Sequence, residues 1–145
     1  MLRIEGINNG IVIDHIKAGR AMIIYQHLQL EKSNYSVAII KNAKSNKSGK
    51  KDIIKIDDTS NLEIDIDILG VLDPNITVNY IKNEKIVEKR HPRLPEKVTN
   101  IIKCKNPRCI TSDESERELP HIFKLTNREK NVYRCIYCEQ MYKRK

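Results

Sequence analysis

Four cysteines are the residues of this chain best suited to chemistry. They are Cys104, Cys109, Cys135 and Cys138, and the 145-residue chain contains no others. Four residues separate the first pair, two separate the second pair, and 25 lie between the pairs. Two close pairs around a strand-rich spacer are typical of a tetrahedral, all-thiolate zinc site. A closed shell has no position for an activated water, so we expect one structural Zn²⁺ that does no catalysis.

Two disulfides are the alternative interpretation of the same cysteines. Disulfides would require an oxidising compartment, and the N-terminal MLRIEGINNG lacks the apolar segment of a secretory signal. No apolar run approaches the roughly 20 residues of a membrane span. The spacing therefore favours zinc, and we expect a cytoplasmic protein with no membrane association.

A second group of polar residues falls on predicted strands: Glu5, Asp14, His15, Lys51, Lys55, Asn79 and Lys89. Lys51 and Lys55 are four residues apart, so on a strand they face the same side. Lysines with a histidine could bind a polyphosphate, and an aspartate could bind a ribose hydroxyl. The competing interpretation is a solvated sheet face with ordinary lysines.

Motifs of common enzymes are absent from the sequence. It contains no P-loop, no G-x-G-x-x-G, no G-x-S-x-G and no H-E-x-x-H. His27, His91 and His121 are scattered, and we interpret them as packing or surface residues. We therefore expect a chain without catalytic activity of its own.

The formal net charge of +8 is unevenly distributed. Residues 97–145 carry 12 Lys and Arg against 6 Asp and Glu, although four thiolates around Zn²⁺ would reduce this excess. A basic zinc module suits nucleic acid and equally an acidic protein partner. Charge alone does not separate these alternatives.

The elements that must position these residues are mostly short strands. Asn9-Gly10 is a strong turn signal and predicts a hairpin over residues 4–16. Over residues 58–72, apolar residues alternate with acidic ones as in a strand, but Ser60 and Glu63 form a capping box, and we favour a helix. The other predicted elements are a helix over 17–31, strands over 35–42 and 52–56 with a loop over 43–52 between them, and a hairpin over 76–89.

Residues 90–95 contain two prolines and predict a linker between two domains. After it we expect short strands near 99–104, 120–125, 131–135 and 140–143. Roughly 50 residues are too few to fold by apolar burial alone. Structural zinc would supply about 10–16 kcal/mol of apparent folding free energy.

Several separate segments together resemble one known family. IEGINNGIVIDHI, GKKDIIKI, ITVNYI, the RLPE spacer and the C-x4-C…C-x2-C cluster occur in its order and spacing. On these segments the chain resembles the regulatory chain of aspartate carbamoyltransferase, over essentially its whole length. The resemblance implies a non-catalytic allosteric subunit of pyrimidine biosynthesis.

The resemblance also implies a fold and partners. The fold would be α+β, with an N-terminal antiparallel sheet backed by two helices (ferredoxin-like) and a small all-β zinc-ribbon or rubredoxin-like domain. Residues 1–92 would form the effector-binding allosteric domain, and residues 97–145 the zinc domain that docks on the catalytic chain. The chain would dimerise, link catalytic trimers, and bind CTP, UTP or ATP, with no nucleic acid and no membrane as partner.

The family's effector contacts fall on matching positions of this sequence: Ile4, Glu5, Gly6, Ile7, Val12, Asp14, His15, Lys51, Lys55, Asn79, Ile81, Glu84, Ile86 and Lys89. The resemblance implies that Asp14 contacts the ribose, that His15 and Lys89 lie near the phosphates, and that Lys55 lies near the ribose and base. Glu84 departs from the tyrosine of a well-studied relative, which puts the base preference in doubt.

A zinc-ribbon protein that binds nucleic acid is the alternative of a different class. The C-terminal region carries Phe123, Tyr133, Tyr137 and Tyr142, whose rings could stack on bases. The same rings could instead form the core of a small module. Co-elution with a catalytic chain or with nucleic acid would separate the two functions.

Overall fold

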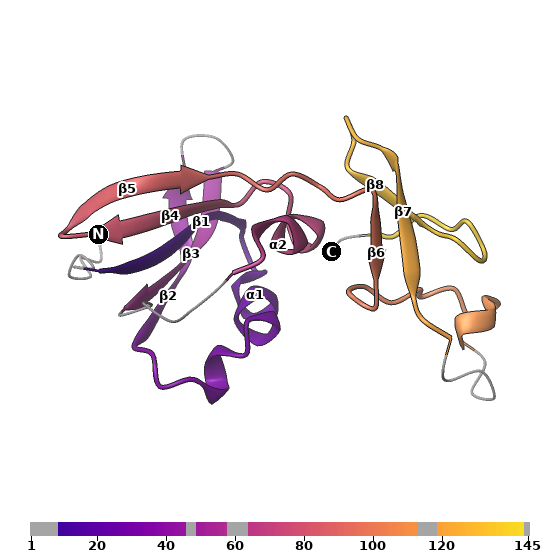
Figure 1. The fold of residues 1–145 in the computed structure, drawn as a ribbon, viewed down its shortest axis with the longest axis horizontal. Helices are drawn as coiled ribbons and strands as arrows, with labels where there is room; N and C mark the ends of the chain where they lie inside the picture. The colour runs from indigo at the N-terminus through magenta and orange to yellow at the C-terminus, as the bar shows by residue number, and fades with distance from the viewer. Residues whose placement is uncertain (1–8, 46–48, 58–63, 113–118, 144–145) are drawn as a thin grey trace. The chain divides into compact units, whose positions relative to one another are not determined.

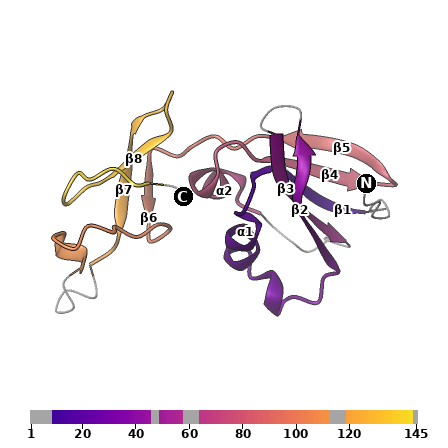
Figure 2. The same ribbon diagram turned by 180° about the vertical axis from the view of Figure 1, so that it is seen from behind.

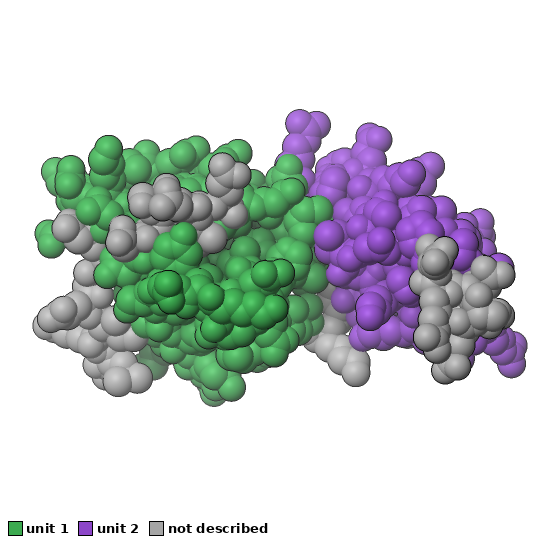
Figure 3. Space-filling model, turned by 60° about the horizontal axis from the view of Figure 1, so that its bottom comes forward, with its two compact units in different colours: residues 1–92 green, residues 93–145 purple. Residues whose placement is uncertain are grey.

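The computed structural model describes residues 9–45, 49–57, 64–112 and 119–143. The chain divides into two compact units, residues 1–92 and 93–145, which Figure 3 colours separately. The first unit is a sheet with two helices, and the second is a small three-stranded sheet. The predicted α+β fold with two domains is therefore confirmed.

The first unit is built on a five-stranded antiparallel sheet in the order β2-β3-β1-β4-β5 (Figure 1). Its strands are β1 (Gly10–Lys17), β2 (Val37–Ser45), β3 (Gly49–Asp57), β4 (Thr77–Lys82) and β5 (Lys85–Arg90). Helix α1 (Ala21–His27) connects β1 to β2, and α2 (Ile66–Leu72) connects β3 to β4. This βαββαβ connectivity is ferredoxin-like, and β5 extends the sheet beyond β4.

The core of the first unit lies between one face of the sheet and the two helices (Figures 1 and 2). Ile13, Ile54 and Val78 are fully buried on that face, and Ile24 of α1 and Leu69 of α2 are fully buried against it. Each such side chain contributes about 1.5–3 kcal/mol through burial. Because strand side chains alternate, the residues between them point to the other, helix-free face.

The hairpin predicted over residues 4–16 is wrong in its pairing. Residues 4–8 lie outside the described part of the chain, but β1 itself has β3 on one side and β4 on the other. Both of its hydrogen-bonding edges are thus used by strands far along the chain. Asn9-Gly10 signalled a turn from local sequence, whereas the pairing is decided by the whole sheet.

Both helices are shorter than predicted. β1 continues to Lys17, so α1 begins only at Ala21, and Gln29 in a left-handed conformation (φ 55°) follows its end. α2 begins at Ile66, where Asp65 caps it by accepting a 3.2 Å hydrogen bond from the Ile68 N–H. The capping box predicted at 60–63 lies outside the described residues.

The loop predicted over residues 43–52 is largely strand. β2 continues to Ser45 and β3 begins at Gly49, with Lys44 opposite Lys50. The polar side chains suggested a loop, but ladder hydrogen bonds join backbone groups and tolerate polar residues. The strand predicted over 52–56 is confirmed and is longer than expected.

The hairpin predicted over 76–89 is confirmed as β4 and β5. Its turn residues, Asn83 and Glu84, both have a left-handed backbone, with φ of 52° and 66°. Two such residues make a type I′ turn, whose twist matches that of paired strands.

The second unit contains β6 (Lys97–Thr99), β7 (Ile122–Asn127) and β8 (Val132–Cys135), in that order and antiparallel. Phe123 and Tyr133 are fully buried in its core. The strands predicted near 120–125 and 131–135 are confirmed. The strand predicted near 99–104 ends earlier, at Thr99, and the one near 140–143 is reduced to a single bridge between Met141 and Arg134.

Candidate functional site

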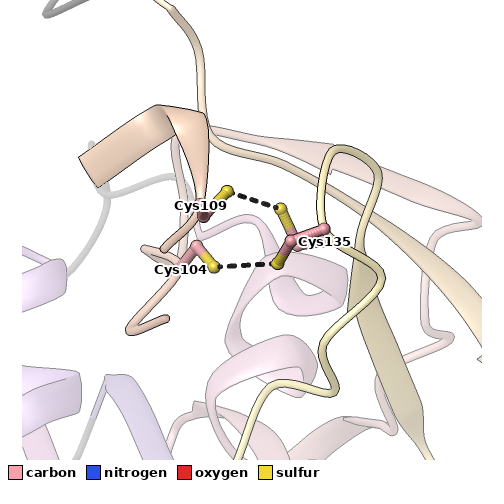
Figure 4. A group of neighbouring side chains, drawn as sticks. Cys104, Cys109 and Cys135 are labelled. Carbon is pink, nitrogen blue, oxygen red and sulfur yellow. Dashed lines mark hydrogen bonds between the residues drawn. The ribbon is translucent and has the colours of Figure 1, made fainter. Parts of the chain in front are cut away.

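The four cysteines come from two parts of the second unit. Cys104 and Cys109 lie in the connection between β6 and β7, and Cys135 and Cys138 lie at and just after the end of β8. Their sulfurs all lie within 4.8 Å of one another, and none is in a disulfide. The Sγ atoms are 3.6 Å apart for Cys104 and Cys138, and 3.7 Å apart for Cys109 and Cys135. Figure 4 shows the sulfurs of Cys104, Cys109 and Cys135 turned toward one another.

This geometry fits a tetrahedral thiolate site. Zn–S bonds of about 2.3 Å at tetrahedral angles separate neighbouring sulfurs by about 3.8 Å. A disulfide would require about 2.05 Å, which excludes the alternative interpretation for this arrangement. The donor set, all sulfur and closed by four ligands, is that of a structural zinc site.

Without a metal, burial favours the protonated form of two of the thiols. Burial raises the pKa of Cys104 from 9.0 to about 12 and raises the pKa of Cys135 as well. Burial also acts upward on Cys138, but hydrogen bonds from the Asn106 side chain and the Gln140 backbone outweigh it and lower its pKa to about 7. A bound divalent cation deprotonates coordinating thiols. A zinc ion would therefore hold all four cysteines as thiolates and offset their negative charge.

Two residues beside the cysteines were missed by sequence reasoning. The Nδ1 of His121 accepts a 3.2 Å hydrogen bond from the Cys104 N–H, and the Thr111 hydroxyl donates a 3.1 Å hydrogen bond to the Cys109 sulfur. Thr111 is only two residues from its partner, so the Cys-x-Thr pattern could have indicated it. His121, 17 residues from Cys104, is close to the cysteines in the sequence, but four cysteines already fill the site and gave it no role.

The aromatic residues considered for base stacking mostly belong to the core. Tyr133 is 0% exposed and Phe123 is 1% exposed. Tyr142 packs edge-on against Phe123, with ring centroids 5.8 Å apart. Tyr137 is exposed, but one exposed ring makes no stacking platform.

The predicted effector residues gather on the helix-free face of the first sheet. One cross-strand row, from β3 through β1 and β4 to β5, contains Lys55, Val12, Asn79 and Lys89. The row spans three interstrand spacings, about 14 Å in all. Residues remote in sequence are thus brought side by side.

Asp14 and Lys51 form an ion pair next to this row. The Lys51 Nζ lies 3.0 Å from an Asp14 carboxylate oxygen, and both side chains are mostly buried. His15 follows in a left-handed conformation (φ 59°), at a bulge in β1. Thr77 lies opposite Asp14 on β4 and was not among the predicted residues.

The remaining predicted residues that the structure describes are Ile81, Ile86 and Glu84, at the β4–β5 side of this face. Ile81 of β4 is opposite Gly10 on β1 and opposite Ile86 on β5. It lies two residues from Asn79, a member of the row. Glu84 is in the β4–β5 turn. Ile4, Glu5, Gly6 and Ile7 lie outside the described residues.

Comparison with known proteins identifies one family for both units. The family model "Aspartate carbamoyltransferase regulatory chain, allosteric domain" matches residues 2–93, and the corresponding "metal binding domain" matches residues 96–145. The chain belongs to the family of aspartate carbamoyltransferase regulatory chains. It is accordingly a non-catalytic, allosteric regulatory chain.

Named relatives in this family resemble the chain along almost its entire length. The regulatory chain of Clostridium tetani is 54% identical over 145 residues, covering 99% of this chain and 97% of the relative. That of Clostridium acetobutylicum is 53% identical over 143 residues, covering 99% and 95%. That of Bifidobacterium longum is 40% identical over 139 residues, covering 96% and 97%.

The two family matches assign a different role to each unit of this regulatory chain. The metal-binding domain contains the four-cysteine cluster, which fits structural zinc. The allosteric domain contains the polar row on the open sheet face. In the described part of the chain, no helix has the length and hydrophobicity needed to cross a membrane.

Proposed function

We propose that this regulatory chain binds a nucleoside triphosphate (CTP, UTP or ATP) on the helix-free face of its first sheet. In the same proposal, a Zn²⁺ held by Cys104, Cys109, Cys135 and Cys138 maintains residues 97–145 as the domain that docks on the catalytic chain. Residues 1–92 form the allosteric domain, which pairs with a second copy. Effector binding then changes the response of the catalytic chain to aspartate.

The observation that carries the effector site is the row of Lys55, Val12, Asn79 and Lys89 beside the Asp14–Lys51 pair. Lysines at both ends of a row about 14 Å long suit a ligand with polar groups along its whole length. As the resemblance implies, the base and ribose would lie near Lys55 and Val12 and the phosphates near Lys89 and His15, so the two lysines would contact different parts of one nucleotide. Charge-assisted hydrogen bonds to phosphate are among the stronger ones.

Two buried polar atoms on this face support the same proposal. The Asn79 Oδ1 and the His15 Nδ1 are buried and make no hydrogen bond to the residues that the structure describes, and the His15 Nδ1 lies 3.8 Å from an Asp14 carboxylate oxygen. Buried polar atoms almost always have a partner, because leaving one unsatisfied costs about 1–3 kcal/mol. A ligand with hydroxyl, amino and phosphate groups would satisfy them.

Exposed apolar side chains support the proposed partners. On the second unit, Ile110, Ile136 and Met141 are 49%, 45% and 37% exposed. On the first, Met22 and Ile23 of α1 are 44% and 39% exposed. Side chains of this kind favour protein contacts over solvent, as docking on a catalytic chain and pairing with a second copy require.

Replacing Lys55 with Ala tests the effector site directly. The loss of one charged hydrogen-bond donor should weaken CTP and ATP binding by about 10- to 100-fold, or about 1.5–3 kcal/mol. Zinc content should not change. Calorimetric titration of the full chain with each nucleotide measures the effect.

Lys82→Ala is the matched control, because Lys82 is exposed and, by strand alternation, lies on the opposite face from Asn79 and Ile81. It should bind both nucleotides as the natural chain does. Equal affinities for Lys55→Ala and the natural chain would refute the assignment.

A further inference from the structure

Asp52 of β3 is a buried carboxylate that neither site uses. It is 0% exposed, and because strand side chains alternate, it points to the helix-covered face while Lys51 points to the open face. Its Oδ2 accepts hydrogen bonds from the backbone N–H of Gly19 at 3.0 Å and of Ala21 at 3.2 Å. Its Oδ1 accepts one from the N–H of Asn42 at 3.0 Å. One carboxylate therefore ties the start of α1 to β2.

Two bulges lie on either side of β3, close to Asp52. The β1–β3 ladder shifts between Ile13 and Ile16, and the β2–β3 ladder shifts between Ile40 and Ala43. Each irregular segment contains a non-glycine residue in the left-handed region, His15 and Asn42, both with φ of 59°. Such conformations are uncommon and persist only where the surrounding structure holds them.

Asp52 adjoins both irregular segments, but its carboxylate binds only the one in β2. It pairs with Ile16, directly after the bulge that contains His15, and its carboxylate binds the Asn42 N–H inside the other bulge. A bulge changes the direction in which nearby side chains point. On the β1 side the Asp52 carboxylate binds the N–H groups of Gly19 and Ala21, which follow β1, so its influence on Asp14 and His15 would pass through the backbone between them.

Lys51 connects Asp52 to the same cluster. It is the chain neighbour of Asp52, and its Nζ lies 3.0 Å from the Asp14 carboxylate. A movement of β3 at Asp52 would thus shift the Lys51 ammonium relative to Asp14 and His15. Such a movement should shift Lys55 and Asn79 less, because the strand pairing that joins Val12 to Lys55 and to Asn79 is regular.

We infer that Asp52 is a positioning residue for the phosphate-binding end of the effector site, acting through the two bulges and not by contact with the ligand. This inference rests on the proposed function, in which the nucleotide phosphates bind beside His15. Its signature is selective: the contribution of the phosphates to affinity should depend on Asp52 more than the contribution of the nucleoside does.

Asp52→Asn tests the inference with little change of shape. A carboxamide has one acceptor oxygen in place of two, so the variant can bind the start of α1 or the bulge in β2, but not both. Calorimetry on the full chain with CTP and with CMP gives the ratio of their affinities. We expect CTP affinity to fall about tenfold or more while CMP affinity falls much less, since triphosphate contacts are charge-assisted.

Asp73→Asn is the control for stability. Asp73 is also buried, at 3% exposed, and its carboxylate accepts from the N–H groups of Lys17 at 2.7 Å and Asn75 at 3.3 Å, outside both bulges. Its loss should lower the unfolding temperature and leave the CTP-to-CMP ratio unchanged. An unchanged ratio in Asp52→Asn, or an equal fall in both variants, would overturn the inference.

Gly19→Ala decides the question if Asp52→Asn does not fold. Gly19 has a φ of 93°, and no heavy atom lies within 4 Å of an added Cβ, so the change strains only the backbone that donates to Asp52. We expect a smaller fall in the same ratio, and an unchanged ratio would overturn the inference. If the natural chain itself fails to bind CTP, the proposed function fails and the inference with it, whereas normal binding with an unchanged ratio removes only the inference.

Discussion

A histidine outside the four-cysteine cluster is hydrogen-bonded to one of its cysteines. The backbone N–H of Asn100 donates to the His121 carbonyl at 2.7 Å, and the His121 N–H donates to the Asn100 side chain at 2.9 Å. The ring Nδ1 of His121 then accepts from the Cys104 N–H at 3.2 Å. Because Nδ1 is an acceptor, the proton of the neutral ring is on Nε2. Cys104 is thereby fixed to the residues that lead into β7.

Removing this acceptor should loosen the zinc site. We expect His121→Leu to release zinc to a chromophoric chelator about 10-fold faster or more, in line with typical effects of residues that support ligands. His121→Gln should be closer to the natural chain, since its side-chain oxygen can accept the same N–H. His91→Leu, at an exposed position before the second unit, is the control. Equal release rates for His121→Leu and the natural chain would contradict this role.

The clustering of the four cysteines could be predicted from the sequence, whereas the long-range contacts of His121 and Asp52 could not. The cysteine pairs are separated by four and two residues, and such short spacings already bring thiols together. Asp52 and His121 act on partners that only folding brings near. Asp52 lies 31 residues from Ala21 and ten from Asn42, so no local pattern marked it as more than a strand residue.

Local turn signals predicted the β4–β5 hairpin correctly but not the pairing of β1, because pairing depends on the whole sheet. The β4–β5 hairpin followed from local signals, with Asn83 in its turn. The helix predicted over residues 17–31 is present as α1, but its start at Ala21 was not predicted, because Arg20 at its N-cap makes no side-chain cap and Asp52 supplies the acceptor from β3. The polar end of β2 and the polar start of β3 were predicted to be a loop, because their strand pairing is not visible in their composition.

The second unit should require its metal to fold, while the first should not. The unit is small, and its fully buried apolar core is formed mainly by Phe123 and Tyr133. Structural zinc supplies about 10–16 kcal/mol in modules of this size. We therefore expect Cys135→Ser, or removal of zinc by a chelator, to unfold residues 93–145 and leave β1 to β5 folded.

Hydrogen exchange measured along the chain tests this expectation. Amides of β6 to β8 should lose protection, while amides of the first sheet keep it. Ile136→Ser is the matched control, because Ile136 follows Cys135 and is 45% exposed. Persistent protection of β6 to β8 in a zinc-free Cys135→Ser chain would show that the fold does not depend on the metal.

At the scale of the whole molecule, the connection between the units is shorter than the sequence predicted. The Leu94 carbonyl accepts from Arg128 at 2.9 Å, the Pro95 carbonyl accepts from the Tyr133 hydroxyl at 2.6 Å, and the Glu96 carbonyl accepts from the Leu125 N–H at 2.8 Å. Residues 94–96 are thus held by the second unit. Only residues 91–93, with Pro92 among them, follow the end of β5 before this anchor.

A short connection that contains a proline should transmit a conformational change from one unit to the other. Allosteric coupling is typically about 1–3 kcal/mol, and a flexible tether would dissipate it. Inserting several glycines after His91 should preserve zinc content, nucleotide affinity and assembly with the catalytic chain, but reduce the effect of nucleotides on activity. The same glycines appended after Lys145 serve as the control. Full regulation by the chain with the internal insertion would show that a stiff connection is not required.

The most direct test of the whole account is the aspartate saturation curve of purified catalytic trimers, measured with and without this chain and with CTP or ATP present. An effector changes activity only if it binds the two states of the assembly with different free energy. We expect nucleotides to leave the trimers alone unaffected, the isolated chain to have no carbamoyltransferase activity, and the assembly to shift its aspartate response when nucleotide is added. Assembled complexes whose aspartate response is the same with and without nucleotide would contradict the account.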